Sequence, residues 1–305
     1  MLCQEASSVT YDWDTDTLFV VGDGGTSVVQ VSKTGQLINS MTLATGSSPQ
    51  GTEFYDTEGI TYVGGGQFVF TEERYRQANL FTYVAGGTLQ RSATRTVKLG
   101  TTIGNIGLEG VSYDPQTSGF LFVKEKDPES IFQTGIDFNA LTATNGSPTA
   151  TGSTDLFNPA LANTLDFSDV FALSNLPALA GKPTSSHLLI ISQESGRIVH
   201  LDRNGTIYSS LTIVADPGNP LSVPDQTHEG VTMDRSGFLY TVLRKRRRRQ
   251  QSPPALGLCA LHRHEPGAHR SHPQQRGHLH PGEYQHGRAR EGRGYPRARR
   301  WPRHE

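Results

Sequence analysis

The segment Asp56-Thr-Glu-Gly-Ile-Thr-Tyr62 returns 51 residues later as Gly107-Leu-Glu-Gly-Val-Ser-Tyr113. Three more divergent copies are Glu5-Ala-Ser-Ser-Val-Thr-Tyr11, Asp166-Phe-Ser-Asp-Val-Phe-Ala172 and Thr227-His-Glu-Gly-Val-Thr-Met233. The apolar fifth residues of the five copies are Val9, Ile60, Val111, Val170 and Val231, at intervals of 51, 51, 59 and 61 residues. A motif that recurs at such intervals indicates a repeat architecture.

Each copy is followed by a turn and then by a run rich in β-branched and aromatic residues, at 18–23, 68–72, 120–125, 188–193 and 239–243. Further apolar runs follow, and Asn204-Gly205 between two of them is a strong hairpin signal. Four short antiparallel strands in each repeat predict the blades of an all-β propeller. A β-sandwich is the structural alternative, but it would not repeat one motif at blade-sized intervals.

We expect a propeller domain over residues 1–243, with blades that start near residues 5, 56, 107, 166 and 227. Five starts are visible, so the ring should hold five or six four-stranded blades. The fifth blade loses its outer strands near residue 243, and no strand precedes Glu5 to close the ring. The ring is therefore expected to be incomplete at both ends, with exposed strand edges.

Residues 244–305 have a different composition from the rest of the chain. Residues 1–243 hold 12 Lys and Arg against 25 Asp and Glu, a formal charge of −13, whereas residues 244–305 hold 16 against 4, a charge of +12. The second segment has no Val, Ile, Phe, Met, Thr, Asp or Asn and contains eight of the 11 histidines. Since it has almost nothing to bury, we expect disorder.

Three interpretations of this basic tail stay open. The abrupt change in mid-strand favours translation of a shifted reading frame. The arginine run 246–249 would suit a nucleic-acid-binding arm. The third interpretation is metal capture by histidines whose irregular spacing fits no ligand template, namely His262, His264, His269, His272, His278 and His280.

Acidic residues gather where the first strand of each repeat starts and where the second strand ends, two points that share one face of a propeller near its central channel. At the first-strand starts stand Glu5, Asp56, Glu58, Glu109, Asp166 and Glu229. At the second-strand ends stand Asp23, Glu72 and Glu125, with Gln193 in the fourth repeat and Arg244 in the fifth. Like charges so close together raise one another's pKa, and a hard cation such as Ca²⁺ relieves that cost.

These nine carboxylates are therefore predicted calcium ligands. Two alternatives stay open: each carboxylate caps backbone N–H groups at its own blade entrance, or the face recognises a cationic ligand directly. Three basic side chains near this face, Arg74, Lys124 and His228, are candidate contacts for an anionic substrate, although pairing with neighbouring carboxylates or a structural role also explains them.

The ordered set of Asp/Glu-x-Glu-Gly-Ile/Val-Thr/Ser first strands resembles the SdiA-regulated β-propeller family, which is similar to the esterase-like phytase propellers. Three further segments carry the resemblance: Thr71-Glu72-Glu73-Arg74, Lys124-Glu125-Lys126-Asp127-Pro128 and Asp166-Phe167-Ser168-Asp169. It covers residues 5–243 and implies a propeller of the bacterial periplasm, envelope or exterior, with calcium at the acidic face.

Composition narrows the function classes further. No stretch approaches the ~18 consecutive apolar residues of a membrane span. Cys3 and Cys259 are too few for a cysteine-based zinc site, and residues 1–4 show no signal-peptide pattern. We expect a calcium-binding module that binds a small-molecule or envelope ligand at the channel mouth. The alternative is a calcium-dependent phosphoester hydrolase, in which Ca²⁺ bridges a phosphate to Glu58, Glu72, Glu109 and Glu125.

Overall fold

The computed structural model describes residues 2–214, 227–243 and 262–264. The chain divides into two units, Met1–Gly267 and Ala268–Glu305, and the second unit lies wholly outside the described residues. The disorder predicted for residues 244–305 also falls outside them, apart from a short strand at His262–His264.

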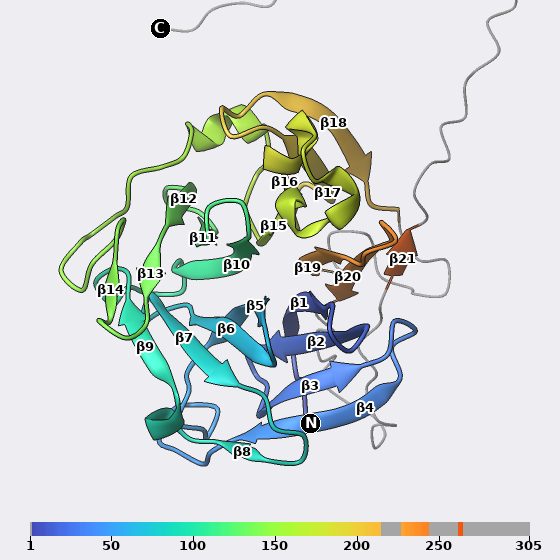
Figure 1. Cartoon of the computed structure of the whole chain (residues 1–305). Coiled ribbons are helices and arrows are strands. Elements are labelled where there is room, and N and C mark those ends of the chain that lie inside the picture. Colours follow the sequence, from blue (N-terminus) through green and yellow to red (C-terminus); the bar gives the residue numbers. More distant parts are fainter. Residues whose placement is uncertain (1, 215–226, 244–261, 265–305) are drawn as a thin grey trace, which may run out of the picture. The chain divides into compact units, whose positions relative to one another are not determined.

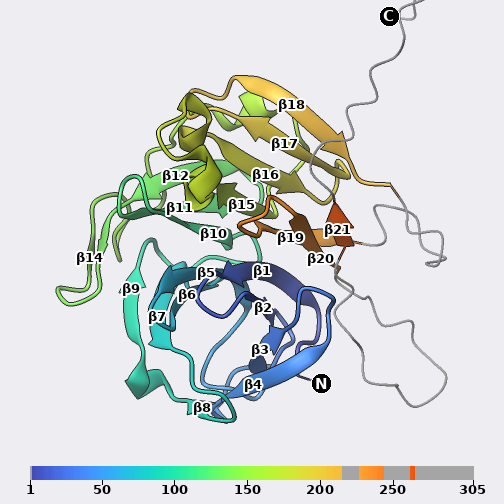
Figure 2. The same cartoon turned by 45° about the vertical axis from the view of Figure 1, so that its right-hand side comes forward.

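Each of the five repeated segments forms the first strand of an antiparallel sheet (Figures 1 and 2). These first strands are β1 (Ala6–Asp12), β5 (Thr57–Gly64), β10 (Leu108–Asp114), β15 (Asp169–Ala172) and β19 (His228–Met233). Their partners are β2 (Thr17–Gly22), β6 (Gln67–Glu72), β11 (Gly119–Lys124), β16 (Leu188–Ser192) and β20 (Leu239–Leu243). The predicted starts at residues 5, 56, 107 and 227 each fall one residue before the observed strand. The start at residue 166 falls three residues before β15.

The sheets differ in their outer strands: the first, second and fourth have the four predicted antiparallel strands, the first gains a fifth strand from the second repeat, and the third and fifth have three described strands. The first sheet continues with β3 (Ser27–Val31), β4 (Leu37–Leu43) and the parallel strand β8 (Thr88–Leu89), and the second with β7 (Gln77–Thr82) and β9 (Arg95–Lys98). The third sheet ends at β12 (Ser130–Thr134), the fourth adds β17 (Arg197–Leu201) and β18 (Ile207–Thr212), and the fifth ends at β21 (His262–His264).

The third sheet lacks a fourth strand because the chain turns away after β12. It forms a separate hairpin of β13 (Ile136–Asp137) and β14 (Thr142–Ala143). The edge of β12 is then covered by a later loop, in which the Leu156 N–H donates to the Ile131 carbonyl (2.7 Å) and the Asp155 carboxylate accepts from the Ile131 N–H (3.2 Å). The edge amide and carbonyl groups are thus satisfied without a strand.

The five first strands form a closed circuit, since β1 contacts β5, β5 contacts β10, β10 contacts β15, β15 contacts β19, and β19 contacts β1. One bond recurs at four of these joints: the backbone N–H of a motif's seventh residue donates to the hydroxyl of the sixth residue in the preceding motif. The bonds are Tyr62 to Thr10 (3.1 Å), Tyr113 to Thr61 (2.8 Å), Ala172 to Ser112 (3.0 Å) and Tyr11 to Thr232 (3.2 Å).

The prediction of an open ring is therefore wrong for the innermost strands. The physical reason lies partly in Asp169, which stands where three other motifs have glycine. Its carboxylate accepts from the Ser8 hydroxyl in β1 (2.9 Å) and from the Val231 N–H in β19 (3.1 Å), so it joins three inner strands at the axis. A side chain at Gly110 would overlap Asp169, which explains a glycine at that position.

An apolar cluster lies between every pair of adjacent sheets. The joint between the fifth and first sheets is packed like the others, with Tyr240 and Val242 against Val20 and Val29. Equivalent clusters fill the remaining four joints. Both faces of the inner strands are therefore covered, which explains why the second strands are almost continuously apolar.

The described helices are 3₁₀ turns of three or four residues and are far too short to span a bilayer. They are η1 (Arg91–Ala93), η2 (Pro159–Ala162), η3 (Leu173–Asn175), η4 (Pro177–Leu179) and η5 (Pro183–Ser186). The described chain is thus an all-β propeller arrangement, as its sequence predicted.

Candidate metal centre

A cavity of about 380 Å³ lies on the axis, at the end where the first strands begin. Five of the predicted carboxylates line it, namely Glu5, Glu58, Glu109, Glu125 and Glu229. The wall also contains Glu194, Lys126, Asn105, Ser168 and Gln193. The five apolar anchors of the repeats line the axis further along, around a space of about 10 Å³, close to the volume that one water needs. The acidic cavity is therefore a bowl at one end of the axis.

Positive φ angles and register shifts at the starts of the first strands direct carboxylates toward the axis. Glu5, Asp56 and Thr227 have positive φ angles of 54°, 60° and 47°, immediately before β1, β5 and β19. The pairing register then shifts near the start of the strand, between Thr57 and Ile60 in β5 for example, and equivalent shifts occur in β1, β10 and β19. Such bulges redirect side chains, and here they turn the third residue of the motif toward the cavity.

Three of the predicted ligands form a compact group, of which Glu58 lines the bowl and Asp23 and Asp56 do not. Asp23, Asp56 and Glu58 each offer a carboxylate oxygen, and these oxygens all lie within 4.8 Å of one another. Burial raises the pKa of Asp56, while hydrogen bonds from Asp23 and Arg74 act in the opposite direction. Because carboxyl groups this close repel when both are ionised, the group favours either a shared proton or a bound cation.

A second group consists of Glu125, Asp166 and Glu194, whose oxygens also lie within 4.8 Å of one another. Lys126 already supplies a positive charge there, with its Nζ 2.6 Å from Glu125 and 3.2 Å from Glu194. Asp166 also accepts bonds from the Glu194 N–H (3.0 Å) and the hydroxyls of Ser168 and Ser192. This group is therefore largely satisfied by the protein.

Glu109 also lines the bowl, among the carboxylates of the neighbouring repeats. Enclosure by protein raises the pKa of Glu109 well above its ordinary value, and the neighbouring charges of Glu58, Glu73, Glu125 and Glu229 raise it further. Burial also raises the pKa of Glu73, whose carboxylate accepts a bond from the Gly107 N–H (2.8 Å). The bowl thus carries more negative charge than its own basic residues balance.

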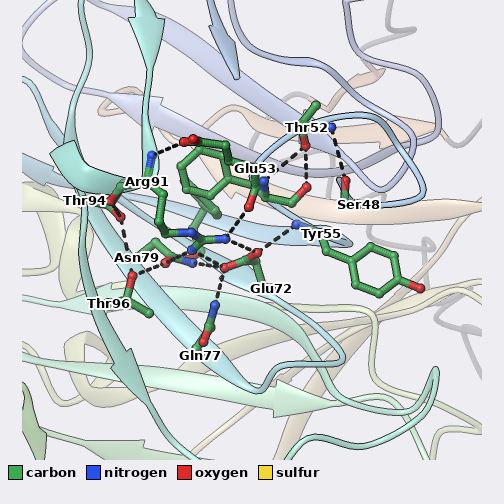
Figure 3. A network of polar contacts seen from close by, with 12 residues as sticks. Ser48, Thr52, Glu53, Tyr55, Glu72, Gln77, Asn79, Arg91, Thr94 and Thr96 are labelled. Atoms are coloured by element: carbon green, nitrogen blue, oxygen red, sulfur yellow. Dashed lines mark hydrogen bonds and ion pairs between the residues drawn. The ribbon is translucent and has the colours of Figure 1, made fainter. Parts of the chain in front are cut away.

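Glu72 does not belong to this bowl, which corrects the prediction (Figure 3). Its side chain is fully buried beside η1, where its two oxygens accept bonds from the Arg91 guanidinium (2.6 and 2.7 Å), the Tyr55 N–H (2.8 Å) and the Asn79 amide (3.0 Å). Since this carboxylate is fully used inside the second sheet, it has no capacity left for a metal ion.

Glu73 occupies the place predicted for Glu72. The pairing register matches Thr57 with Glu72 and Leu108 with Lys124, so the equivalent of Glu125 is the next residue, Glu73. The sequence contains the signal: the sixth residue counted from the start of each apolar run is Asp23, Glu73, Glu125 or Gln193 in the first four repeats. The second-strand run of the second repeat therefore extends to residue 73, one residue beyond the predicted 68–72.

Two of the three predicted anion contacts are directed elsewhere. Lys124 is buried, and its ammonium group donates to the Lys126 and Pro128 carbonyls of the loop that follows its strand. His228 is buried within the fifth sheet, where its Nδ1 lies 3.3 Å from the Thr241 hydroxyl. Arg74 does reach the face, but it is paired with Asp56 and bonded to Asn105. Lys126, the other lysine of the segment 124–126, lines the cavity in place of Lys124.

A circuit of antiparallel sheets, each of which contributes its first strand to a common axial cavity, defines this molecule as a β-propeller protein. The model of one family, described as SdiA-regulated, matches residues 2–243. The chain belongs to the SdiA-regulated family, and the resemblance predicted from its repeats is confirmed.

Several solved structures are similar in fold. A chain in the crystal structure of a nidogen/laminin complex is 14% identical, with a TM-score of 0.48 over 79% of this chain and 73% of that chain. A luciferin-regenerating enzyme is 11% identical, with a TM-score of 0.46 over 79% and 84% of the two chains. The β-propeller domain of Cps50 (Swd1) from Myceliophteria thermophila is 12% identical, with a TM-score of 0.40 over 80% and 66%. These likenesses concern the fold alone.

Proposed function

We propose that this protein is a calcium-binding propeller module that acts by binding a small-molecule or envelope ligand at the mouth of its acidic bowl. The observation that carries the proposal is the group of Asp23, Asp56 and Glu58, with three oxygens within 4.8 Å of one another. Through Glu58 this group borders a cavity lined by carboxylates from several repeats. Burial, with like-charge repulsion second, raises the pKa of Glu109 and Asp56, and one divalent cation there would favour their ionised forms.

The donor set suits Ca²⁺ in particular. Carboxylate, amide and hydroxyl oxygens line the bowl, and neither cysteine nor histidine is among its described lining residues. Calcium accepts six to eight such oxygens in flexible geometry, whereas softer metals prefer nitrogen and sulfur. Asp23, Asp56 and Glu58 would hold the ion, since Arg74 pairs with one carboxylate of this group, whereas Lys126 pairs with two carboxylates of the opposite group.

Two further properties belong to this proposal. We propose that the complete ring counts five blades, since the five inner strands already form a circuit. We also propose that the module works in the bacterial periplasm, envelope or exterior, as the family resemblance implies. Calcium sites of extracellular modules bind with Kd values of roughly 0.1–1 mM, and we expect an affinity in that range.

Calcium titration of the full-length protein after EDTA dialysis tests the proposal. A saturating excess of Ca²⁺, about a hundred times Kd, stabilises a folded protein by ~2.7 kcal/mol, which for a domain of this size raises Tm by about 5–10 °C. Glu58→Gln removes one ligand charge and should abolish most of that increase, as followed by differential scanning calorimetry.

Asp137→Asn is the matched control, since it also removes one carboxylate, from an exposed turn where asparagine can accept the same bonds from the Asn139 and Ala140 N–H groups. It should respond to calcium like the wild type. Absence of any Tm increase in the wild type, or an equal increase in Glu58→Gln, would contradict a calcium site in this bowl.

Binding is favoured over phosphoester hydrolysis because the cations at the face are already paired, Arg74 with Asp56 and Lys126 with Glu125 and Glu194. A phosphate would have to displace these carboxylates. Calcium-dependent release of phosphate from p-nitrophenyl phosphate, lost in Glu58→Gln, would establish the hydrolase instead.

A further inference from the structure

A second cavity, of about 430 Å³, lies on the outer side of the first two sheets and shares no lining residue with the acidic bowl. The loop between β4 and β5 forms one side of it, and its chemically distinctive lining residues are Ser47, Ser48, Glu53, Tyr55, Tyr75 and Arg91. Its volume lies within the range of small-molecule sites. Nothing in the proposed calcium function uses it.

Two tyrosine rings form the aromatic part of the wall. The rings of Tyr55 and Tyr75 lie 5.7 Å apart at 69°, so they meet as a corner, and Tyr75 is 38% exposed. Figure 3 shows the Tyr55 ring pointing away from the polar network around Glu72. No hydrogen bond involves either tyrosine hydroxyl within the described part of the chain. Each ring therefore offers an apolar face together with a polar tip.

The charges in the wall select against a charged ligand. The Arg91 guanidinium is bonded to both Glu72 oxygens, to the Asn79 side chain (3.0 Å) and to the Glu53 carbonyl (2.8 Å), so its charge is already balanced. The exposed Glu53 carboxylate accepts a bond from the Arg91 N–H and would repel an anion. A cationic ligand would find the cation–π position at the Tyr55 ring already taken by the Arg74 guanidinium, 5.2 Å from the ring centroid.

The loop that completes the wall is held in place before any ligand arrives. The Gly46 N–H donates to the Gly51 carbonyl (3.0 Å), the Gly51 N–H to the Ser48 carbonyl (2.8 Å), and the Thr52 N–H to the Ser48 hydroxyl (3.2 Å). Gly51 has a φ of 79°, which this turn requires and which glycine adopts without strain. A pre-organised wall lowers the entropic cost of binding.

We propose that this outer cavity binds a neutral saccharide. The C–H faces of a pyranose ring pack against tyrosine rings, and its hydroxyl groups can donate to Glu53 and accept from the tyrosine hydroxyls. A corner of two aromatic rings, one carboxylate acceptor and several hydroxyls matches a ligand that carries many hydroxyl groups and no net charge. The cavity shares no lining residue with the bowl, but Arg74 contacts both the Tyr55 ring and the proposed calcium ligand Asp56, so saccharide binding is measured with and without calcium.

Saturation-transfer NMR of the full-length protein with a panel of neutral trisaccharides (maltotriose, cellotriose, mannotriose and chitotriose) tests this inference in EDTA and in calcium. We expect at least one of them to bind in both buffers. Tyr75→Ala removes one wall and should weaken that binding roughly tenfold or more, as measured by titration calorimetry. Tyr75→Phe retains the ring and should keep most of the affinity.

Tyr208→Ala is the control, since it also deletes an exposed tyrosine, on β18 in the fourth sheet, and should leave binding unchanged. Three results would overturn the proposal: no trisaccharide binds at about 10 mM, binding survives Tyr75→Ala, or choline binds this cavity and the saccharides do not. Loss of the calcium response alone would leave this proposal standing and overturn only the function assigned to the bowl.

Discussion

Glu109 illustrates at the level of one residue how the bowl responds to protons. Its folded pKa lies well above the ordinary value of 4.5, because protein encloses the group and four other carboxyl groups surround it. Between the unfolded and folded pKa values, the folded protein keeps a proton that the unfolded chain has released. The contribution of Glu109 to stability is therefore present at low pH and is lost as pH rises through this window.

Glu109→Gln isolates this effect, because the neutral amide cannot ionise. Without divalent cations the variant should be more stable than the wild type at about pH 8, and its advantage should shrink toward about pH 5. Tm measurements across pH in EDTA provide the check. Saturating calcium should remove or reverse the advantage, since the bound cation offsets the wild-type charge. A constant difference at every pH would show that Glu109 does not titrate in this range.

At the scale of single elements, Glu72 connects pieces of the second sheet that the backbone ladder does not join. It lies at the end of β6 and accepts bonds from Arg91 in η1, Asn79 in β7 and the Tyr55 N–H before β5. Arg91 also stacks over the Phe54 ring, 4.2 Å from its centroid. A buried carboxylate with this many donors holds the elements in register and has no ligand to bind.

Glu72→Gln should destabilise the protein without altering calcium binding. The change leaves the Arg91 guanidinium without its anion, at a cost of about 2–3 kcal/mol, toward the low end for a broken buried pair because Arg91 is one-third exposed. Urea unfolding measures the loss, and the calcium-induced rise in Tm should persist. The double variant Glu72→Gln/Arg91→Gln should lose less than the sum of the two single changes. If Glu72→Gln lost the calcium response and kept the stability of the wild type, Glu72 would be a calcium ligand as the sequence predicted.

For the whole molecule, stability depends on the closed circuit of inner strands. The joint between β19 and β1 uses the same bond as the others, from the Tyr11 N–H to the Thr232 hydroxyl, and an apolar cluster of the same kind. Lys33 in the loop after β3 adds an ion pair across this joint with Asp234, which is buried, at 3.5 Å. The last and first sheets therefore support each other.

Thr232→Val and Thr61→Val test whether the circuit is closed in solution. Each change leaves one backbone N–H, of Tyr11 or of Tyr113, without its acceptor, and each should cost about 1–3 kcal/mol in chemical unfolding. Similar losses are expected, because the two threonines are 2% and 5% exposed and occupy equivalent positions. A near-neutral Thr232→Val beside a destabilising Thr61→Val would mean that the ring is open between β19 and β1.

Much of the inner architecture was predictable, whereas the outer strands were not. The alternating motif identifies the first strand of each sheet because one residue of slip would turn Ile60 or Val111 out of the core. The outer strands have no such constraint: β12 ends its sheet because a loop through Asp155 covers its edge. Ring closure was missed because it depends on contacts between Thr232 and Tyr11, 221 residues apart, which local pattern does not reveal.

The sequence alone determined that acidic side chains recur at equivalent strand entrances, because a period-two pattern specifies which side of a strand each residue occupies. Tertiary structure decided which of them meet. Residues with positive φ and register shifts at the starts of the first strands bring Asp23, Asp56 and Glu58 together. The ion pair with Arg91 holds Glu72 away from that group. The reason is physical: metal ligation requires atoms placed to within an ångström, and only the packed sheets hold the backbone that precisely.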